Sequence, residues 1–272
     1  MIGPGALAAQ LVLLRTMSML SPSPFPLSGR VVLVTGVSRQ VGIAFGLAQA
    51  MHRLGATVFA TGWRPHDDAM AWGAGPALDA PFAVHSHDLA LPDVPGQLIG
   101  QVIAEYGAID VVLAVHAQSS SASLFETTAE ELDSSWAVNV RSVVLLARAF
   151  AERRDRTRGT GRMIWFTSGQ ALGPMARELP YAITKGALHQ MTISLADALA
   201  DVGIVANCIN PGPVDTGYAS PEVHAEVASM FPSGRWGTVD DVVNLVSFLV
   251  SDAGEWISGQ VINSEGGFRR GQ

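Results

Sequence analysis

The sequence is poor in cysteine and in charged side chains. It contains one cysteine, Cys208, which excludes an intrachain disulfide and is typical of a reducing compartment. Charged residues make up 15% of the 272 residues and hydrophobic residues 48%, a balance that supplies a sizeable core and argues against bulk disorder. The formal net charge of −7 argues against a protein that binds nucleic acid through its phosphates. We therefore expect a folded, cytoplasmic protein with no nucleic-acid partner.

The sequence also lacks a hydrophobic run long enough to cross a bilayer. The apolar stretch Ala6–Leu14 has the length of a signal-peptide core, but no lysine or arginine precedes it and Arg15 follows it. Prolines at alternate positions in residues 21–26 break regular structure. We predict that residues 1–27 are a disordered leader, or upstream sequence before a later start methionine, and we expect no membrane partner.

From residue 28 onward, β-branched runs alternate with helical patterns. We expect strands at 31–34, 57–61, 82–85, 110–115, 163–167, 204–208 and 260–263, and helices at 43–54, 94–106, 129–152, 181–201 and 239–250. Such alternation implies a parallel sheet that helices cover on both faces. The sequence therefore predicts a single α/β domain over residues 28–272, with a doubly wound, Rossmann-type parallel sheet.

A tyrosine and a lysine stand four positions apart in Tyr181-Ala-Ile-Thr-Lys185, so they share one face of a helix. An ammonium beside a phenol favours the phenolate and would lower the phenol pKa from about 10. The pair would then give and take a proton near neutral pH. The same spacing also describes a surface lysine beside a half-buried tyrosine, so other motifs must decide between the two interpretations.

A glycine-rich turn joins the first strand to the first helix in Thr35-Gly-Val-Ser-Arg-Gln-Val-Gly-Ile-Ala44. Backbone N–H groups and the helix dipole meet a pyrophosphate in such a turn, although a tight turn without a ligand is the alternative. Here the chain resembles the short-chain dehydrogenase/reductase family, whose turn reads Thr-Gly-x-x-x-Gly-x-Gly. Aligned backwards from Gly55, the turn is one residue longer than usual, as in the enoyl-reductase branch. The resemblance implies cofactor contacts from Gly36, Ser38, Arg39, Gly42 and Ile43.

The second strand ends without a carboxylate. Gly62 stands where an acidic residue would bind the adenosine ribose and repel a 2′-phosphate. Arg39 and Arg64 lie near this place and suit a phosphate, so we expect NADP(H) to be preferred, with NAD(H) possible. Two ordinary surface charges are the alternative.

Two further stretches bear on the cofactor. By resemblance, Asp88 would bond the adenine amino group with Leu89 beside it. The residues Ala114-Val-His-Ala117 replace the family's Asn-Asn-Ala-Gly, which leaves a backbone contact from Ala117. His116 would line the nicotinamide side or pack as an ordinary loop histidine.

Asn139 and Ser168 complete a set of four. Asn139 lies on the long helix, and Ser168 ends the fifth strand, thirteen residues before Tyr181. These positions match the family's Asn–Ser–Tyr–Lys tetrad. The resemblance implies that Tyr181 protonates the carbonyl oxygen, Ser168 hydrogen-bonds it, Lys185 lowers the Tyr181 pKa and holds the nicotinamide ribose, and Asn139 anchors a water. Enoyl reductases generally place their tyrosine seven residues before the lysine, where this chain has Glu178.

The segment Asn210-Pro-Gly-Pro-Val-Asp-Thr216 follows the sixth strand and resembles the family segment that binds the nicotinamide carboxamide. The resemblance implies contacts from Pro211, Val214 and Thr216, and a simple chain turn is the alternative. Residues 217–236 are long and mixed in character. We expect them to cover the substrate as a lid, or else to form a helical insertion on the surface.

These features together predict an NADP(H)-dependent oxidoreductase that transfers a hydride between nicotinamide and a carbonyl or secondary alcohol. It resembles 3-oxoacyl-carrier-protein reductases most, and an enoyl reductase or a nonenzymatic dinucleotide-binding regulator are the alternatives. We expect a small-molecule substrate and a homotetramer or homodimer in which helices near 129–152 and 180–201 pair. His85 and His87 share a strand face without companion ligands, so we expect no metal site.

Overall fold

The computed structural model describes residues 25–270, so most of the leader expected at 1–27 lies outside the described residues. Leu27, at the end of that stretch, is buried in the core cluster beneath the first helix. Its backbone N–H donates to the carbonyl of Leu54 at 3.0 Å. Packing of the domain therefore begins before residue 28, because this apolar side chain fills a place in the core.

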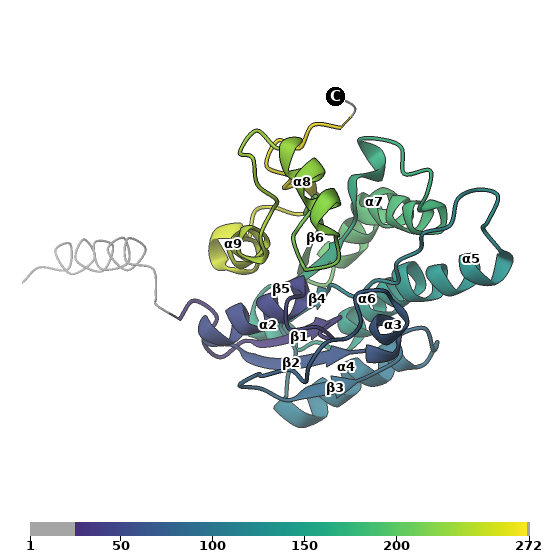
Figure 1. Cartoon of the computed structure of the whole chain (residues 1–272). Coiled ribbons are helices and arrows are strands. Elements are labelled where there is room, and N and C mark those ends of the chain that lie inside the picture. The colour runs from purple at the N-terminus through teal and green to yellow at the C-terminus, as the bar shows by residue number, and fades with distance from the viewer. Residues whose placement is uncertain (1–24, 271–272) are drawn as a thin grey trace, which may run out of the picture.

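Seven parallel strands form one sheet in the order β3-β2-β1-β4-β5-β6-β7 (Figure 1). They are β1 (Val31–Thr35), β2 (Thr57–Gly62), β3 (Val84–Ser86), β4 (Val111–Ala114), β5 (Gly161–Phe166), β6 (Ile204–Asn210) and β7 (Val261–Asn263). β1 pairs with both β2 and β4, so the strand order reverses there. Every residue of β1, β4 and β5 is buried, which explains their continuous apolar sequences. The predicted doubly wound Rossmann-type fold is confirmed.

Helices cover both faces of this sheet. They are α2 (Ile43–Arg53), α3 (Arg64–Ala69), α4 (Val94–Tyr106), α5 (Ala129–Trp136), α6 (Ser142–Arg153), α7 (Leu179–Ala200), α8 (Pro221–Ser229) and α9 (Val239–Val250). α2 and α9 pack into one core cluster, whereas α4, α6 and α7 pack into the other, on the opposite face. Within residues 25–270, no helix is long and apolar enough to cross a membrane.

Several elements differ from the expected bounds. A π-helical turn, Ala137–Arg141, divides the helix expected at 129–152 into α5 and α6. The third strand is shorter than expected, because Phe82 packs its ring against His52 instead of entering the sheet. α3 was not expected. α8 lies within residues 217–236, for which a helical insertion was one of the two expectations, and Ser220 caps its first turn.

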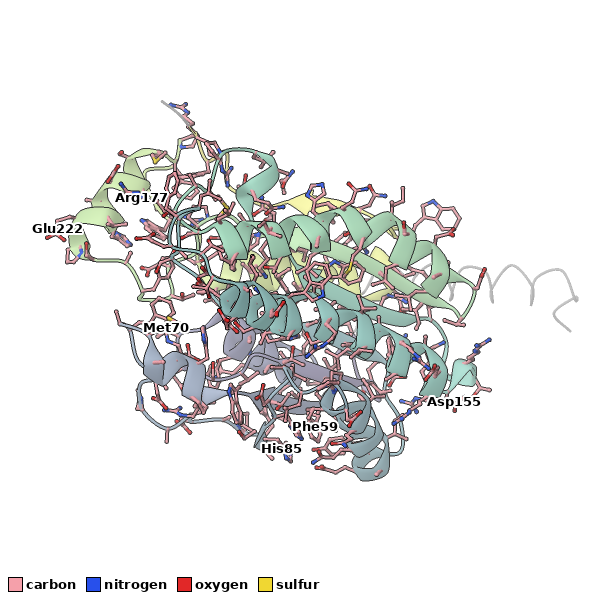
Figure 2. All side chains as sticks on the ribbon, turned by 90° about the vertical axis from the view of Figure 1, so that its right-hand side faces the viewer. Phe59, Met70, His85, Asp155, Arg177 and Glu222 are labelled. Carbon is pink, nitrogen blue, oxygen red and sulfur yellow. The ribbon has the colours of Figure 1, made fainter. Side chains whose placement is uncertain are left out.

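The two ends of the strands differ in chemistry. At the amino ends, the buried carboxylate of Asp110 accepts hydrogen bonds from the Val31 N–H at 2.8 Å and from the Arg158 guanidinium at 2.8 and 2.9 Å. Figure 2 shows Asp155 at this end of the molecule and Met70, Arg177 and Glu222 at the opposite end. The amino ends are thus closed by an ion pair, and a ligand must enter at the carboxyl ends.

Candidate functional site

A cleft of about 1220 Å³ opens at the carboxyl ends of the strands. Residues that directly follow β1, β4, β5 and β6 line it, as expected at the point where the strand order reverses. The cleft brings together most of the residues predicted for the site: Gly36, Ser38, Arg39, Gly42, Ile43, Asp88, Leu89, Ala117, Ser168, Tyr181, Lys185, Pro211, Val214 and Thr216. Arg64 and Asn139 lie outside its lining.

The glycine-rich turn has the shape that an anion site requires. Gly36 has a φ of +84°, and a Cβ there would lie 2.7 Å from the backbone of His116, so only glycine fits. α2 begins at Gly42 with no side-chain cap and no acidic residue in its first turn. Its first backbone N–H groups therefore meet the cleft without a competing carboxylate, which suits a pyrophosphate.

The end of β2 excludes an acidic side chain by geometry. A Cβ at Gly62 would lie 2.1 Å from the carbonyl oxygen of Val37, whose N–H donates to the carbonyl of Thr61 at 2.9 Å. The turn thus packs directly on Gly62, and a residue with a carboxylate would displace it. This close approach fits a cofactor whose adenosine ribose needs no acidic partner.

The two arginines near this turn stand in different surroundings. Arg39 lines the cleft, where its guanidinium lies 5.7 Å from the ring centroid of Trp72 and donates to the carbonyl of Thr216 at 2.9 Å. Arg64 lines a smaller neighbouring pocket and donates to the carbonyls of Gly75 at 2.7 Å and Ser38 at 3.2 Å. Arg39 is therefore the better placed of the two to meet a ligand phosphate.

Ser168, Tyr181 and Lys185 converge on the cleft from the end of β5 and the first turns of α7. The Ser168 hydroxyl stands close enough to the Tyr181 phenol to favour the phenolate and so to act against the rise in the phenol pKa. The Lys185 Nζ donates to the carbonyl of Phe166 at 2.8 Å and lies 5.3 Å from the centroid of the Tyr181 ring. Lys185 is also the only lysine in the sequence.

The pKa of Tyr181 is shifted opposite to the expected direction. Burial raises the phenol pKa above its ordinary value, and the negative charge of Glu178 adds to the rise. Burial also lowers the pKa of Lys185 to about 8, because its ammonium has little water around it. The cost of burying a phenolate dominates, so the phenol keeps its proton near neutral pH.

Asn139 sits in the π-helical turn, as functional residues of helices often do. Its side-chain oxygen accepts from the Gln118 N–H at 2.6 Å, and its amide nitrogen donates to the Gln118 carbonyl at 2.9 Å and to Thr184 Oγ1 at 3.0 Å. Asn139 thus ties the loop after β4 to α7 from behind the cleft. Asn139 makes these hydrogen bonds from within the π-helical turn. The local sequence pattern does not predict that turn.

His116 packs as a buried link and also lines the cleft. Its Nδ1 lies 2.6 Å from Thr35 Oγ1 and its Nε2 lies 2.7 Å from Ser142 Oγ. Burial, with the charge of Lys185, lowers its pKa to about 3, so the ring is neutral near pH 7. His116 follows β4, and its ring therefore links β4 to β1 through Thr35 and to α6 through Ser142. It belongs to the segment Ala114–Ala117, which stands where the family has Asn-Asn-Ala-Gly.

Sequence reasoning missed the aromatic wall of the cleft. The Tyr218 ring lies edge-on to Trp72, with centroids 6.3 Å apart, and to Trp236, with centroids 5.8 Å apart. Burial raises the pKa of Tyr218 to about 12. Trp72 stands in an apolar, glycine-rich loop that gave no signal in the sequence. Tyr218 and Trp236 lie within residues 217–236, the segment expected to cover the substrate, but neither residue was named there.

The two strand histidines are occupied by packing and hydrogen bonds. His85 stacks on Phe59 with ring centroids 4.1 Å apart (Figure 2). His87 Nδ1 lies 2.8 Å from Thr61 Oγ1, and its Nε2 lies 3.0 Å from Gln101 Oε1. Within residues 25–270, no group of three or more histidine, cysteine or acidic side chains is arranged to hold a metal ion.

The fold and this cleft together define a dinucleotide-binding oxidoreductase. The family model described as "Enoyl-(Acyl carrier protein) reductase" matches residues 36–269. The "Uncharacterized oxidoreductase YjdA" of Bacillus subtilis is 36% identical over 89% of this chain and 98% of its own length. A chloroplastic "NADPH-dependent aldehyde reductase-like protein" of Arabidopsis thaliana is 32% identical over 93% of this chain and 99% of its own.

Solved structures agree with this assignment. A short-chain dehydrogenase from Burkholderia cenocepacia, crystallised in complex with NADP, is 30% identical with a TM-score of 0.76, over 89% of this chain and 98% of that one. A blue fluorescent protein from a metagenomic library, in complex with NADPH, is 28% identical with the same TM-score of 0.76, over 89% and 99% of the two chains. This chain belongs to the short-chain dehydrogenase/reductase family and is an oxidoreductase.

Proposed function

We propose that this protein reduces a carbonyl group, or oxidises the corresponding secondary alcohol, with NADP(H). The observation that carries the proposal is the meeting of Ser168, Tyr181 and Lys185 in the cleft that also holds the glycine-rich turn. The bound dinucleotide would supply or accept the hydride at its nicotinamide ring. The remaining chemistry, which is binding and proton transfer, falls to the residues of the chain.

Each of the three side chains suits one role in reduction. The raised pKa of Tyr181 keeps the phenol protonated near neutral pH, so it has a proton to give to the carbonyl oxygen. Ser168, whose hydroxyl lies near that phenol in the cleft, would donate to the same oxygen as negative charge develops there. Lys185 would stabilise the phenolate that remains, because its ammonium lies near the ring and little water intervenes.

The placement of the phenol supports carbonyl reduction over enoyl reduction. The family model carries an enoyl-reductase description, and the turn after β1 has the longer form of that branch. Enoyl reductases generally place their tyrosine seven residues before the lysine, and the residue there is Glu178, whose carboxylate cannot replace a phenol. Tyr181 stands instead at the four-residue spacing of carbonyl and alcohol chemistry.

The preference for NADP(H) is part of the proposal. Gly62 leaves no room for an acidic residue at the end of β2, and Arg39 offers a guanidinium inside the cleft. Two of the solved relatives hold NADP or NADPH. Asp88 and Leu89, at the end of the cleft beyond β3, would bind the adenine.

We also propose that the protein works in the cytoplasm as a homotetramer or homodimer. The one cysteine, Cys208, is free and buried, as suits a reducing compartment. α5 and α7 pack against each other and expose apolar side chains, with Trp136 47% and Ile193 69% exposed. Pairing of these helices between subunits would cover that surface.

Replacing Tyr181 with phenylalanine tests the catalytic role. We expect Tyr181→Phe to lower kcat/KM for NADPH-dependent ketone reduction by about 10²- to 10⁴-fold, because the proton donor is lost while the ring and its packing remain. The dissociation constant for NADPH, measured by nicotinamide fluorescence, should change less than about threefold, since no charge is removed.

The chain supplies a matched control. It has three tyrosines, and Tyr106, at the end of α4, stands outside the cleft, so Tyr106→Phe should leave turnover unchanged. Turnover by Tyr181→Phe equal to that of Tyr106→Phe would overturn the catalytic assignment. NADPH binding by the unaltered protein without turnover of any carbonyl compound would favour the nonenzymatic regulator instead.

A further inference from the structure

Glu178 presents a carboxylate to the cleft that no other side chain in residues 25–270 pairs or hydrogen-bonds. It is the N-cap residue of α7, yet its side chain caps no backbone N–H of that helix. It lines the cleft together with Tyr181, and its charge is near enough to help raise the pKa of that phenol. Partial burial raises the carboxyl pKa, and no neighbouring cation opposes that rise.

The charges near Glu178 do not offset it. Glu131, also in the lining, already accepts a hydrogen bond from Ser120 Oγ at 2.7 Å. Arg270 lines the same cleft, but both of its terminal nitrogens donate to the carboxylate of Glu265, one of them at 2.6 Å. Of the cations that line this part of the cleft, Lys185 is therefore the one without a carboxylate partner among residues 25–270, and its Nζ donates to the carbonyl of Phe166 at 2.8 Å. The carboxylate of Glu178 would repel a ligand carboxylate or phosphate beside it.

A carboxylate that faces the cleft and has no partner in the protein can accept a hydrogen bond from a donor on the ligand. A hydroxyl group suits this place better than an ammonium group, because Lys185 carries positive charge close to the position of the reacting carbonyl. The rest of the lining beyond Tyr181 includes the neutral polar side chains of Gln118, Ser119 and Ser121.

We infer that Glu178 is a specificity-determining residue that accepts a hydrogen bond from a substrate hydroxyl near the carbonyl, so that the preferred substrates are uncharged hydroxyketones or hydroxyaldehydes. Substrates with a carboxylate or phosphate at that position are rejected by the same charge. This inference rests on the proposed carbonyl reduction and adds the substrate class to it.

Four ketones of similar size separate these possibilities: hydroxyacetone, 2-butanone, pyruvate and aminoacetone. With NADPH, the unaltered protein should reduce hydroxyacetone with a kcat/KM at least about tenfold above that for 2-butanone, since a hydrogen bond to a charged group distinguishes the two. Pyruvate should be the poorest of the four. Glu178→Met should bring the ratio of hydroxyacetone to 2-butanone close to one, and Glu178→Gln should raise kcat/KM for pyruvate about tenfold.

Glu222→Gln is the matched control, because it removes the same charge from α8 outside the cleft lining and should leave every ratio unchanged. Equal turnover of hydroxyacetone and 2-butanone, or a hydroxyl preference that survives in Glu178→Met, would overturn the inference and leave carbonyl reduction standing. A preference for aminoacetone would overturn the hydroxyl assignment. Failure to reduce any of the four, with NADPH binding intact, would count against the proposed function itself.

Discussion

Arg39 is the residue on which we expect cofactor choice to depend most directly. Its guanidinium stands over Trp72 and donates to the backbone carbonyl of Thr216, so it joins the glycine-rich turn to the start of the substrate loop. When a ligand phosphate binds, the Arg39 guanidinium would donate to the charged phosphate instead of the neutral carbonyl of Thr216. Arg64 is less available to bind a phosphate, because both of its terminal nitrogens already donate to backbone carbonyls outside the cleft.

We expect Arg39→Ala to weaken NADPH binding about tenfold or more while NADH binding changes less than about threefold, because only NADPH carries the 2′-phosphate. Fluorescence titration with each dinucleotide measures both values. Arg64→Ala should have a smaller effect, and Arg53→Ala, on the exposed end of α2, should have none. Equal losses of NADPH and NADH affinity in Arg39→Ala would remove the phosphate contact from the proposal.

Motif residues and lining residues differ in how far the sequence predicts them. Tyr181 and Lys185 were predictable because a four-residue spacing on a helix fixes their common face, and the structure places both in the cleft. Trp72 and Tyr218 were not, since each reaches the cleft from a loop whose path depends on the whole fold. The direction of the Tyr181 pKa was also out of reach, because it depends on burial rather than on the neighbouring lysine alone.

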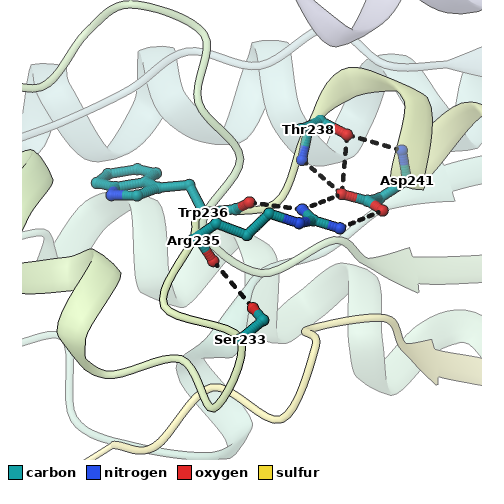
Figure 3. Close-up of polar contacts among 5 residues, drawn as sticks. All are labelled: Ser233, Arg235, Trp236, Thr238 and Asp241. Atoms are coloured by element: carbon teal, nitrogen blue, oxygen red, sulfur yellow. Dashed lines mark hydrogen bonds and ion pairs between the residues drawn. The ribbon is translucent and has the colours of Figure 1, made fainter.

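Among the elements, α9 has the most complete cap, and the cap also fixes the end of the substrate loop (Figure 3). The Asp241 carboxylate accepts from the Thr238 N–H at 2.7 Å and from Thr238 Oγ1 at 2.8 Å. It also accepts from both terminal nitrogens of Arg235, at 2.7 and 3.1 Å. The Arg235 hydrogen bonds, and then those from Thr238, lower the Asp241 pKa below its ordinary value.

This cap predicts a pH dependence with a definite sign. Because the folded-state pKa of Asp241 lies below the unfolded value of about 3.9, its stabilisation is full above that pH and is lost as the pH falls further. Thermal unfolding of Asp241→Asn should therefore show a smaller loss of Tm between about pH 5 and about pH 3 than that of the unaltered protein. Asp240→Asn is the control, because it removes the same charge one residue earlier without touching the capping box. If Asp240→Asn reduces the pH dependence of Tm as much as Asp241→Asn does, the cap is not the cause of that dependence.

Elements with a buried face were predictable, whereas those without one were not. α4 and α9 begin and end where the sequence predicted, because each carries a clear apolar face. α8 has no buried residue, and α3 has only Asp67, so neither shows a hydrophobic period. The π turn between α5 and α6 adds one residue to an otherwise regular helix. Such an insertion cannot be predicted from the spacing of apolar residues along the helix.

On the scale of the whole molecule, structural and functional chemistry occupy opposite ends of the sheet. The ion pair of Asp110 and Arg158 closes the amino ends, and the cleft opens at the carboxyl ends. α5 and α7, beside the cleft, expose apolar surface that a second subunit would cover. Subunit pairing would therefore support the helix that carries Tyr181 and Lys185.

We expect size-exclusion chromatography with light scattering to give the mass of a dimer or tetramer. Ile193→Glu should shift the protein toward smaller species, because it places a charge in an apolar contact on α7. Leu91→Glu alters an exposed apolar residue, 54% exposed, that lies just before α4, and should leave the mass unchanged. A monomeric mass for the unaltered protein would contradict the proposed pairing.

Lys185 also determines how the protein responds to reagents that attack amines. It is the single source of a side-chain amine in the chain, and it is only 2% exposed in the folded protein. Acylating labels, aldehyde fixatives and ubiquitin-type conjugation all react with lysine side chains, and here their one side-chain target is buried in the lining of the cleft. In the folded protein the Lys185 amine is shielded from such reagents, whereas in the unfolded chain it is accessible. The extent of modification of Lys185 would therefore measure the folded fraction. Because Lys185 lines the cleft, it would also respond to a bound ligand.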